Sequence, residues 1–166
     1  MCKKRIIALR GENNTGKTET LKCLISKMLP VAQTIDTEKR FNARMRNKQW
    51  DVWAVFKYQE KYIAITSRGD ALRFIDDDIH KIEDVASAKG FDIDTYVCAI
   101  HTLSKTLGYV ENKAKALGAE LHIYGKATFN CGCYASPNCN CGTSVDEKNV
   151  QSQINHFQTN IIFANL

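Results

Sequence analysis

The stretch that decides the fold is Gly11-Glu12-Asn13-Asn14-Thr15-Gly16-Lys17-Thr18, which has the spacing G-x-x-x-x-G-K-T. It follows a short, continuous apolar run, Ile6-Ile7-Ala8-Leu9, which is typical of a buried parallel strand. Beyond it, apolar residues recur at helical spacing from Leu21 to Leu29, and Pro30 ends that pattern. The sequence therefore predicts a strand, a glycine loop and a helix, in that order.

Each fixed position of this loop has a physical reason. The two glycines let the backbone turn tightly, so that N–H groups and the start of the helix point at phosphate oxygens. We expect Lys17, exposed on the loop, to reach the β- and γ-phosphates, and the Thr18 hydroxyl to ligate Mg²⁺. The alternative is a glycine turn with an exposed lysine. The residues expected to hold the nucleotide are Gly11, Asn13, Asn14, Thr15, Gly16, Lys17, Thr18 and Glu19.

With its flanking strand and helix, the stretch from residue 5 to residue 29 resembles the P-loop NTPase superfamily. The resemblance implies an α/β fold of three layers, α/β/α, and ATP or GTP bound with Mg²⁺. It does not identify a second substrate. The base-recognition motif N-K-x-D of G proteins is missing, so adenine is the default. We expect one nucleotide-binding domain over residues 1–166, with a cysteine-rich insertion at residues 127–143.

The rest of the chain alternates strand and helix patterns, which favours a mostly parallel sheet covered on both faces. Residues 52–56 and 62–65 predict a β-hairpin, and residues 96–100 and 121–124 predict two further strands. Asp76-Asp77-Asp78 is expected to precede a helix over residues 79–86, with an acidic metal cluster as the alternative.

Two more helices are expected in the second half of the chain. One has Leu103, Leu107, Val110 and Leu117 on a single face. The other begins at a capping box, Ser144-Val145-Asp146-Glu147. Its apolar face is expected to consist of Val150, Ile154, Phe157 and Ile161.

A P-loop enzyme also needs an acid that orients the waters around Mg²⁺. No predicted strand ends directly in Asp or Glu, and the nearest candidate is Asp70, which could equally cap the following helix. Thr66 and Ser67 offer hydroxyls closer to the strand end, and His101 ends another strand as either a structural or a catalytic residue. The predicted catalytic residues are thus Lys17, Asp70 and Arg68. Arg68 ranks first among the arginines that could stabilise transferred charge, which are Arg40, Arg44, Arg46, Arg68 and Arg73.

Four of the seven cysteines crowd into one irregular segment as Cys131, Cys133, Cys139 and Cys141. Four thiolates gathered by a tight turn supply the tetrahedral shell that Zn²⁺ prefers, and disulfides or free thiols are the alternatives. A four-cysteine element before the last helix is similar in layout to the zinc-containing thymidine kinases. The C-x-x-C pairs and acid-ending strand of that family are missing, so this nucleoside kinase stays a minor alternative.

The net charge of +5 is concentrated in residues 1–50, chiefly in the basic segment at residues 39–48. That segment is either a solvated face or a lid that closes over a polyanion or contacts nucleic acid. No apolar run approaches the roughly 18–20 residues of a membrane span, and no secretory signal pattern begins the chain, so we expect a cytoplasmic protein. Two functions remain open. One is NTP hydrolysis or phosphoryl transfer to an unidentified acceptor, and the other is a nucleotide-dependent accessory module that binds a protein or nucleic acid.

Overall fold

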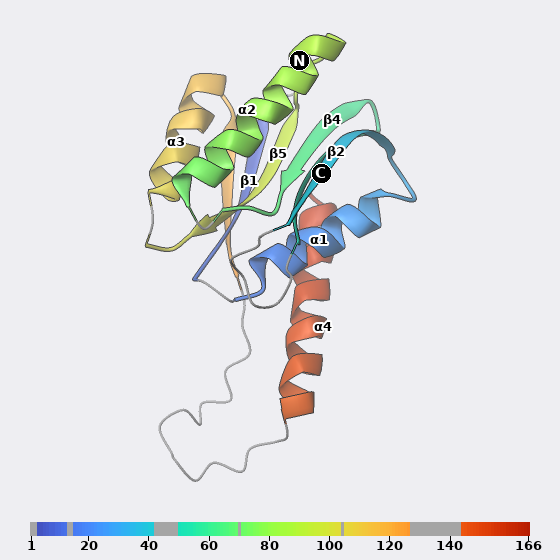
Figure 1. The fold of residues 1–166 in the computed structure, drawn as a ribbon, viewed down its shortest axis with the longest axis vertical. Coiled ribbons are helices and arrows are strands. Elements are labelled where there is room, and N and C mark those ends of the chain that lie inside the picture. Colours follow the sequence, from blue (N-terminus) through green and yellow to red (C-terminus); the bar gives the residue numbers. More distant parts are fainter. Residues whose placement is uncertain (1–2, 13–14, 42–49, 70, 104, 127–143) are drawn as a thin grey trace.

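The chain folds into one sheet with helices on both faces (Figure 1). The structure is a computed structural model and describes residues 3–12, 15–41, 50–69, 71–103, 105–126 and 144–166. The strands are β1 (Arg5–Gly11), β2 (Gln33–Phe41), β3 (Trp50–Tyr58), β4 (Lys61–Thr66), β5 (Thr95–His101) and β6 (Glu120–Gly125). The helices are α1 (Lys17–Met28), α2 (Leu72–Lys89), α3 (Thr106–Leu117) and α4 (Ser144–Phe163).

The sheet has the strand order β2-β3-β4-β5-β1-β6. β1 pairs in parallel with both β5 and β6, and β5 pairs in parallel with β4. The remaining pairs, β2 with β3 and β3 with β4, are antiparallel. The predicted α/β class with a mostly parallel sheet is therefore confirmed. The strand beside β1 on the hairpin side is β5, whereas β4 lies one strand further out.

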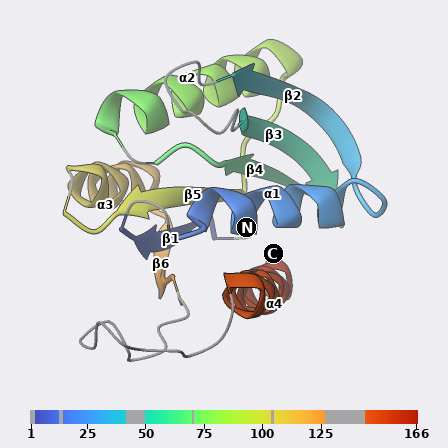
Figure 2. The same ribbon diagram turned by 60° about the horizontal axis from the view of Figure 1, so that its bottom comes forward.

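Helices α2 and α3 cover one face of the sheet, and α1 and α4 cover the other (Figure 2). Alternate residues of β1 supply both cores, because successive side chains of a strand point to opposite faces. Ile6 and Ala8 pack toward α2 and α3, while Ile7 packs toward α1 and α4. This two-sided burial explains why β1 is a continuous apolar run. Among the described residues, no helix combines the length and the apolarity that a membrane span requires.

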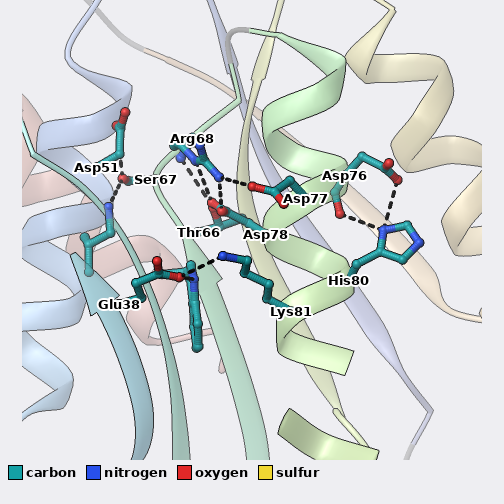
Figure 3. Close-up of polar contacts among 12 residues, drawn as sticks. Glu38, Asp51, Thr66, Ser67, Arg68, Asp76, Asp77, Asp78, His80 and Lys81 are labelled. Atoms are coloured by element: carbon teal, nitrogen blue, oxygen red, sulfur yellow. Dashed lines mark hydrogen bonds and ion pairs between the residues drawn. The ribbon is translucent and has the colours of Figure 1, made fainter. Parts of the chain in front are cut away.

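The predicted hairpin is confirmed, since β3 and β4 form an antiparallel pair with Tyr58 opposite Lys61. Gln59 and Glu60 form the turn, both with positive φ (48° and 64°), as a two-residue hairpin loop demands. The sequence did not predict β2, which contains the beginning of the basic segment. Trp53 helps to hold β2, because its indole Nε1 donates a hydrogen bond of 2.9 Å to Glu38 (Figure 3).

The predicted start of α2 is wrong. The helix begins at Leu72, so Asp76, Asp77 and Asp78 lie in its interior and not before its first turn. Asp78 is buried, with 1% of its surface exposed. A buried carboxylate in a helix needs partners from another element, and Arg68 and Thr66 supply them, as described below.

The predicted face of α3 is confirmed for Leu107, Val110 and Leu117, which pack in the core, whereas Leu103 lies before α3 and is 84% exposed. The predicted face of α4 is wrong. On α4, Phe157 is 66% exposed, while Asn155 and Thr159 are buried. The polar residues are buried because they have partners. Thr159 Oγ1 donates to the main-chain oxygens of Asn155 (2.8 Å) and of Thr20 on α1 (3.1 Å).

Candidate functional site

The glycine loop opens at the edge of the sheet where the parallel strands end. β1, β4, β5 and β6 all finish at this edge, because they run in the same direction. β3 runs the opposite way, so it begins at the same edge. The ends of parallel strands are the usual place for ligands in open α/β sheets. At this edge therefore lie the loop before Lys17, the residues that follow β4, β5 and β6, and the first residues of β3.

Both glycines of the loop occupy positions that a side chain would disrupt. Gly16 is the N-cap of α1 with φ of 83°, in the left-handed region that favours glycine. A Cβ on Gly11 would lie 2.8 Å from Thr15 Oγ1 and 2.9 Å from Lys126 Cβ. The loop is also tied internally, since Thr15 Oγ1 donates to the carbonyl oxygen of Glu12 at 2.9 Å. The glycine positions of the motif are thus explained by local geometry.

Lys17 is the first residue of α1, and the expectation that it is exposed is wrong. Only 4% of its surface is exposed. Its Nζ donates to the carbonyl oxygens of Gly11 (2.9 Å) and Glu12 (2.6 Å), so the ammonium lies within the loop. These two carbonyls give the buried ammonium hydrogen-bond acceptors within the loop. The Lys17 ammonium is therefore directed into the loop.

Thr18, Ser67 and Asp51 connect the helix start to the hairpin. The Thr18 hydroxyl donates a hydrogen bond of 3.4 Å to the carbonyl oxygen of Ser67. Ser67 is buried, accepts a hydrogen bond from Val52 N at 2.9 Å, and directs its hydroxyl toward Asp51 Oδ1 at 3.4 Å (Figure 3). Asp51 was not among the predicted site residues, because a P-loop acid is expected after a strand and Asp51 stands near the start of one.

Arg68, the expected catalytic arginine, is bound to helix α2. Its Nε donates to Asp78 Oδ2 at 3.1 Å, a second nitrogen contacts Asp78 Oδ1, and Asp77 Oδ2 lies 3.0 Å away (Figure 3). Thr66 Oγ1 also donates to Asp78 Oδ2, at 2.6 Å. Burial by itself would lower the pKa of Arg68, but the hydrogen bonds and charges of Asp78 and Asp77 outweigh it and raise that pKa. The geometry makes Arg68 a cross-link between β4 and α2, which conflicts with a role on transferred charge.

His101 also has structural partners. The ring Nδ1 of His101 accepts a hydrogen bond of 3.1 Å from Leu103 N. The main-chain N–H of His101 donates to Thr106 Oγ1 at 3.0 Å. These contacts shape the turn from β5 into α3. Of the two interpretations of His101, the structural one has direct support.

Lys126 is a second lysine beside the glycine loop, and it was not among the predicted site residues. It follows β6, and its N–H donates to the carbonyl oxygen of Arg10 at 2.7 Å. Its side chain packs against Gly11. Burial lowers the pKa of Lys126 to about 8. The position of Lys126 could have revealed it, because it directly follows a strand that ends at the same edge of the sheet as β1.

Two further contacts hold the surroundings of the loop in place. Asn155 of α4 packs against Gly16, with its amide atoms 3.1 and 3.3 Å from where a Cβ would lie. A Cβ on Gly69 would lie 1.8 Å from the carbonyl oxygen of Ala99, so the chain after β4 passes directly over β5. Glu19, expected at the nucleotide, instead pairs with Lys22 at 3.2 Å within the first turns of α1.

Several predicted site residues lie outside the described part of the chain. They are Asn13, Asn14, Asp70, Cys131, Cys133, Cys139 and Cys141. Among the residues that are described, no group of three or more His, Cys, Asp or Glu side chains could hold a metal ion. The zinc prediction therefore stays a prediction.

Comparison of the chain with protein-family models, with curated proteins and with solved structures finds no match.

Proposed function

We propose that the chain binds a nucleoside triphosphate with Mg²⁺ through residues 11–18, as the P-loop resemblance implies. The observation that carries the proposal is the buried Lys17 ammonium, held by two loop carbonyls at the start of α1. Gly16, the N-cap of that helix, has no side chain to occupy the helix N-terminus. A phosphate would there gain main-chain N–H donors, the positive end of the helix and a fixed cation together.

The residues beside the loop offer oxygen donors of the kind that Mg²⁺ prefers. The hydroxyl of Thr18 would ligate the ion directly, and Asp51 and Asp70 are the two carboxylates that could orient its waters. Asp51 lies among the described residues, where Ser67 connects it to Thr18, and Asp70 lies outside them. Bound Mg²⁺ would neutralise charge on the β- and γ-phosphates.

In this proposal the protein mainly positions the phosphates. Lys17 would contact the β- and γ-phosphates, and Lys126 would add positive charge from the β6 side of the loop. Such positioning and charge stabilisation supply most of the catalysis in phosphoryl transfer. Adenine remains the default base, so ATP is the first nucleotide to test and GTP the second.

A nucleotide-dependent accessory module with little turnover is the second candidate function. It is favoured by Arg68, which is committed to Asp77 and Asp78 and so offers no ready charge to a transferred phosphoryl group. Phosphate release from ATP and GTP would separate the two functions. It should be measured alone and with nucleosides, monophosphates and nucleic acids.

The decisive experiment is a calorimetric titration of Mg·ATP into the parent chain and two variants of Lys17. We expect Lys17→Ala and Lys17→Met to lose tight binding, because both remove the ammonium. Lys17→Met keeps the buried aliphatic stem and should preserve thermal stability better than Lys17→Ala. Lys115→Met, at an exposed lysine on α3, is the matched control and should bind normally. Unchanged affinity in folded Lys17→Met would overturn the proposal.

A further inference from the structure

A groove of about 460 Å³ lies between α1 and the first two strands of the antiparallel part of the sheet. Its lining residues are Lys22, Ile25 and Ser26 of α1, the C-cap residue Leu29, Lys39 of β2 and Val52 of β3. Ile25 and Val52 are buried, while Leu29 is 55% exposed. The groove is therefore apolar in its interior and carries a lysine on each wall.

The strand register places the two sheet residues on the same side. Lys39 is the direct partner of Val52 in the β2–β3 pair, and directly paired residues share one face of a sheet. Val52 belongs to the core beneath α1. Lys39 therefore stands on the α1 face, opposite Lys22, with the apolar residues between the two lysines.

One end of this groove lies about one turn of α1 beyond the phosphate loop. Thr18 and Lys22 are four residues apart, so they share a face of α1 and are separated by about 6 Å along the helix axis. Across the groove, Val52 exchanges two hydrogen bonds of 2.9 Å with Ser67, whose carbonyl oxygen faces Thr18. A molecule in the groove would thus lie about one helical turn from Thr18, on the side of the loop where the last phosphate of a bound nucleotide is expected.

We propose that this groove holds a second ligand, an anionic small molecule with an apolar or aromatic ring. Its ring would cover the apolar residues Ile25, Leu29 and Val52. Its negative charge would be attracted by Lys39 and by Lys22, whose ammonium also pairs with Glu19 at 3.2 Å. The volume falls in the range of small-molecule sites, roughly 300–1,000 Å³. The ligand's position beside the terminal phosphate rests on the proposed function, whereas the groove itself does not.

The experiment uses nucleoside monophosphates as probes, because they combine a ring with an anionic group. Adenosine and thymidine 5′-monophosphates are titrated into the full chain in parallel with the uncharged nucleosides. Mg²⁺ and β,γ-imido-ATP are present in saturating amounts, so that the phosphate loop is occupied. Ser26→Glu places a negative charge in the groove at an exposed position, and Lys39→Gln removes a positive one. Lys115→Gln is the control, and circular dichroism and thermal melting verify the fold of each variant.

We expect at least one monophosphate to bind at least tenfold more tightly than its nucleoside. Ser26→Glu and Lys39→Gln should each weaken that binding at least fivefold, with the affinity for β,γ-imido-ATP unchanged. Two results would overturn the inference: no binding of either monophosphate to the folded chain, or binding that Ser26→Glu leaves unaltered. A concentration-dependent dimer in sedimentation experiments that Ser26→Glu dissociates would overturn it as well, because the groove would then be a contact between copies.

Failure of the proposed function gives a different pattern. If β,γ-imido-ATP does not bind, the nucleotide site is wrong, and the same titrations without the analogue still test the groove. In that case Lys17→Met reports whether a monophosphate has entered the phosphate loop instead. Monophosphate binding that survives Lys17→Met but is lost in Ser26→Glu would support the groove alone.

Discussion

Replacing Asp78 with Asn tests whether Arg68 is a structural cross-link. Asp78 is 1% exposed and the Arg68 side chain 11% exposed, so the substitution would leave a mostly buried guanidinium without its main counter-charge. Breaking a buried ion pair on one side typically costs about 3–5 kcal/mol. Asn still accepts hydrogen bonds and Asp77 remains nearby, so we expect the free energy of unfolding to fall by about 3 kcal/mol, the lower end of that range. Urea denaturation monitored by tryptophan fluorescence would measure it, since Trp53 is buried in the core beneath α2.

Asp77 provides the matched control, because it contacts the same arginine nitrogen at 3.0 Å but is 47% exposed. Exposed pairs contribute about 0–1 kcal/mol, so Asp77→Asn should destabilise the protein by less than 1 kcal/mol. Similar losses of unfolding free energy in the two variants would refute the argument, because burial would then not decide the contribution. Neither variant should change nucleotide affinity. A large affinity loss in folded Asp78→Asn would return Arg68 to the list of catalytic candidates.

The remaining predictions concern the metal and phosphate contacts. Asp51→Asn should weaken Mg²⁺-dependent nucleotide binding about tenfold in calorimetry, and the same loss in Asp70→Asn with none in Asp51→Asn would assign the role to Asp70. Burial lowers the pKa of Lys126 to about 8, and a bound triphosphate would raise it again, because it favours the charged amine. Nucleotide binding should therefore take up part of a proton at pH 8 and almost none at pH 6. The buffer dependence of the binding enthalpy measures this uptake, which should vanish in Lys126→Met. Protein purified under reducing conditions should carry about one zinc per chain by elemental analysis, and a metal-free result would rule out the site at Cys131, Cys133, Cys139 and Cys141.

The parts of the fold that could be predicted are those whose signals are local. The run from Ile6 to Leu9, the glycine loop and the apolar spacing of α1 each identify an element without reference to the rest of the chain. The hairpin of β3 and β4 was equally clear, because two apolar strands flank a short polar turn. β2 was missed because its residues are mostly charged or polar, and Ile35 and Phe41 are its apolar members. Its strand structure depends on pairing with β3, which no local pattern reveals.

The burial of polar residues was the harder problem. Asp78 is one of three consecutive aspartates, and Arg68 contacts both Asp77 and Asp78. Only the burial of Asp78, which also accepts a hydrogen bond from Thr66, distinguishes it from Asp77. Asn155 and Thr159 are buried on α4 because Gly16 and the carbonyl oxygen of Thr20 lie against them. A hydrophobicity pattern assigns such residues to the solvent face, and this is why the predicted face of α4 was wrong.

Asp51 shows where a search for functional acids in a mixed sheet should look. Acids that follow strands are the expected candidates, because parallel strands present their carboxyl ends at one edge. In an antiparallel hairpin, however, the first residues of one strand lie beside the last residues of the other. Trp53 pairs with Thr66, so Asp51 lies level with the residues that follow β4. An acid that begins an antiparallel strand can therefore occupy the same place as one that ends a parallel strand. The missing acid is thus no argument against phosphoryl transfer until the Asp51 and Asp70 variants have been compared.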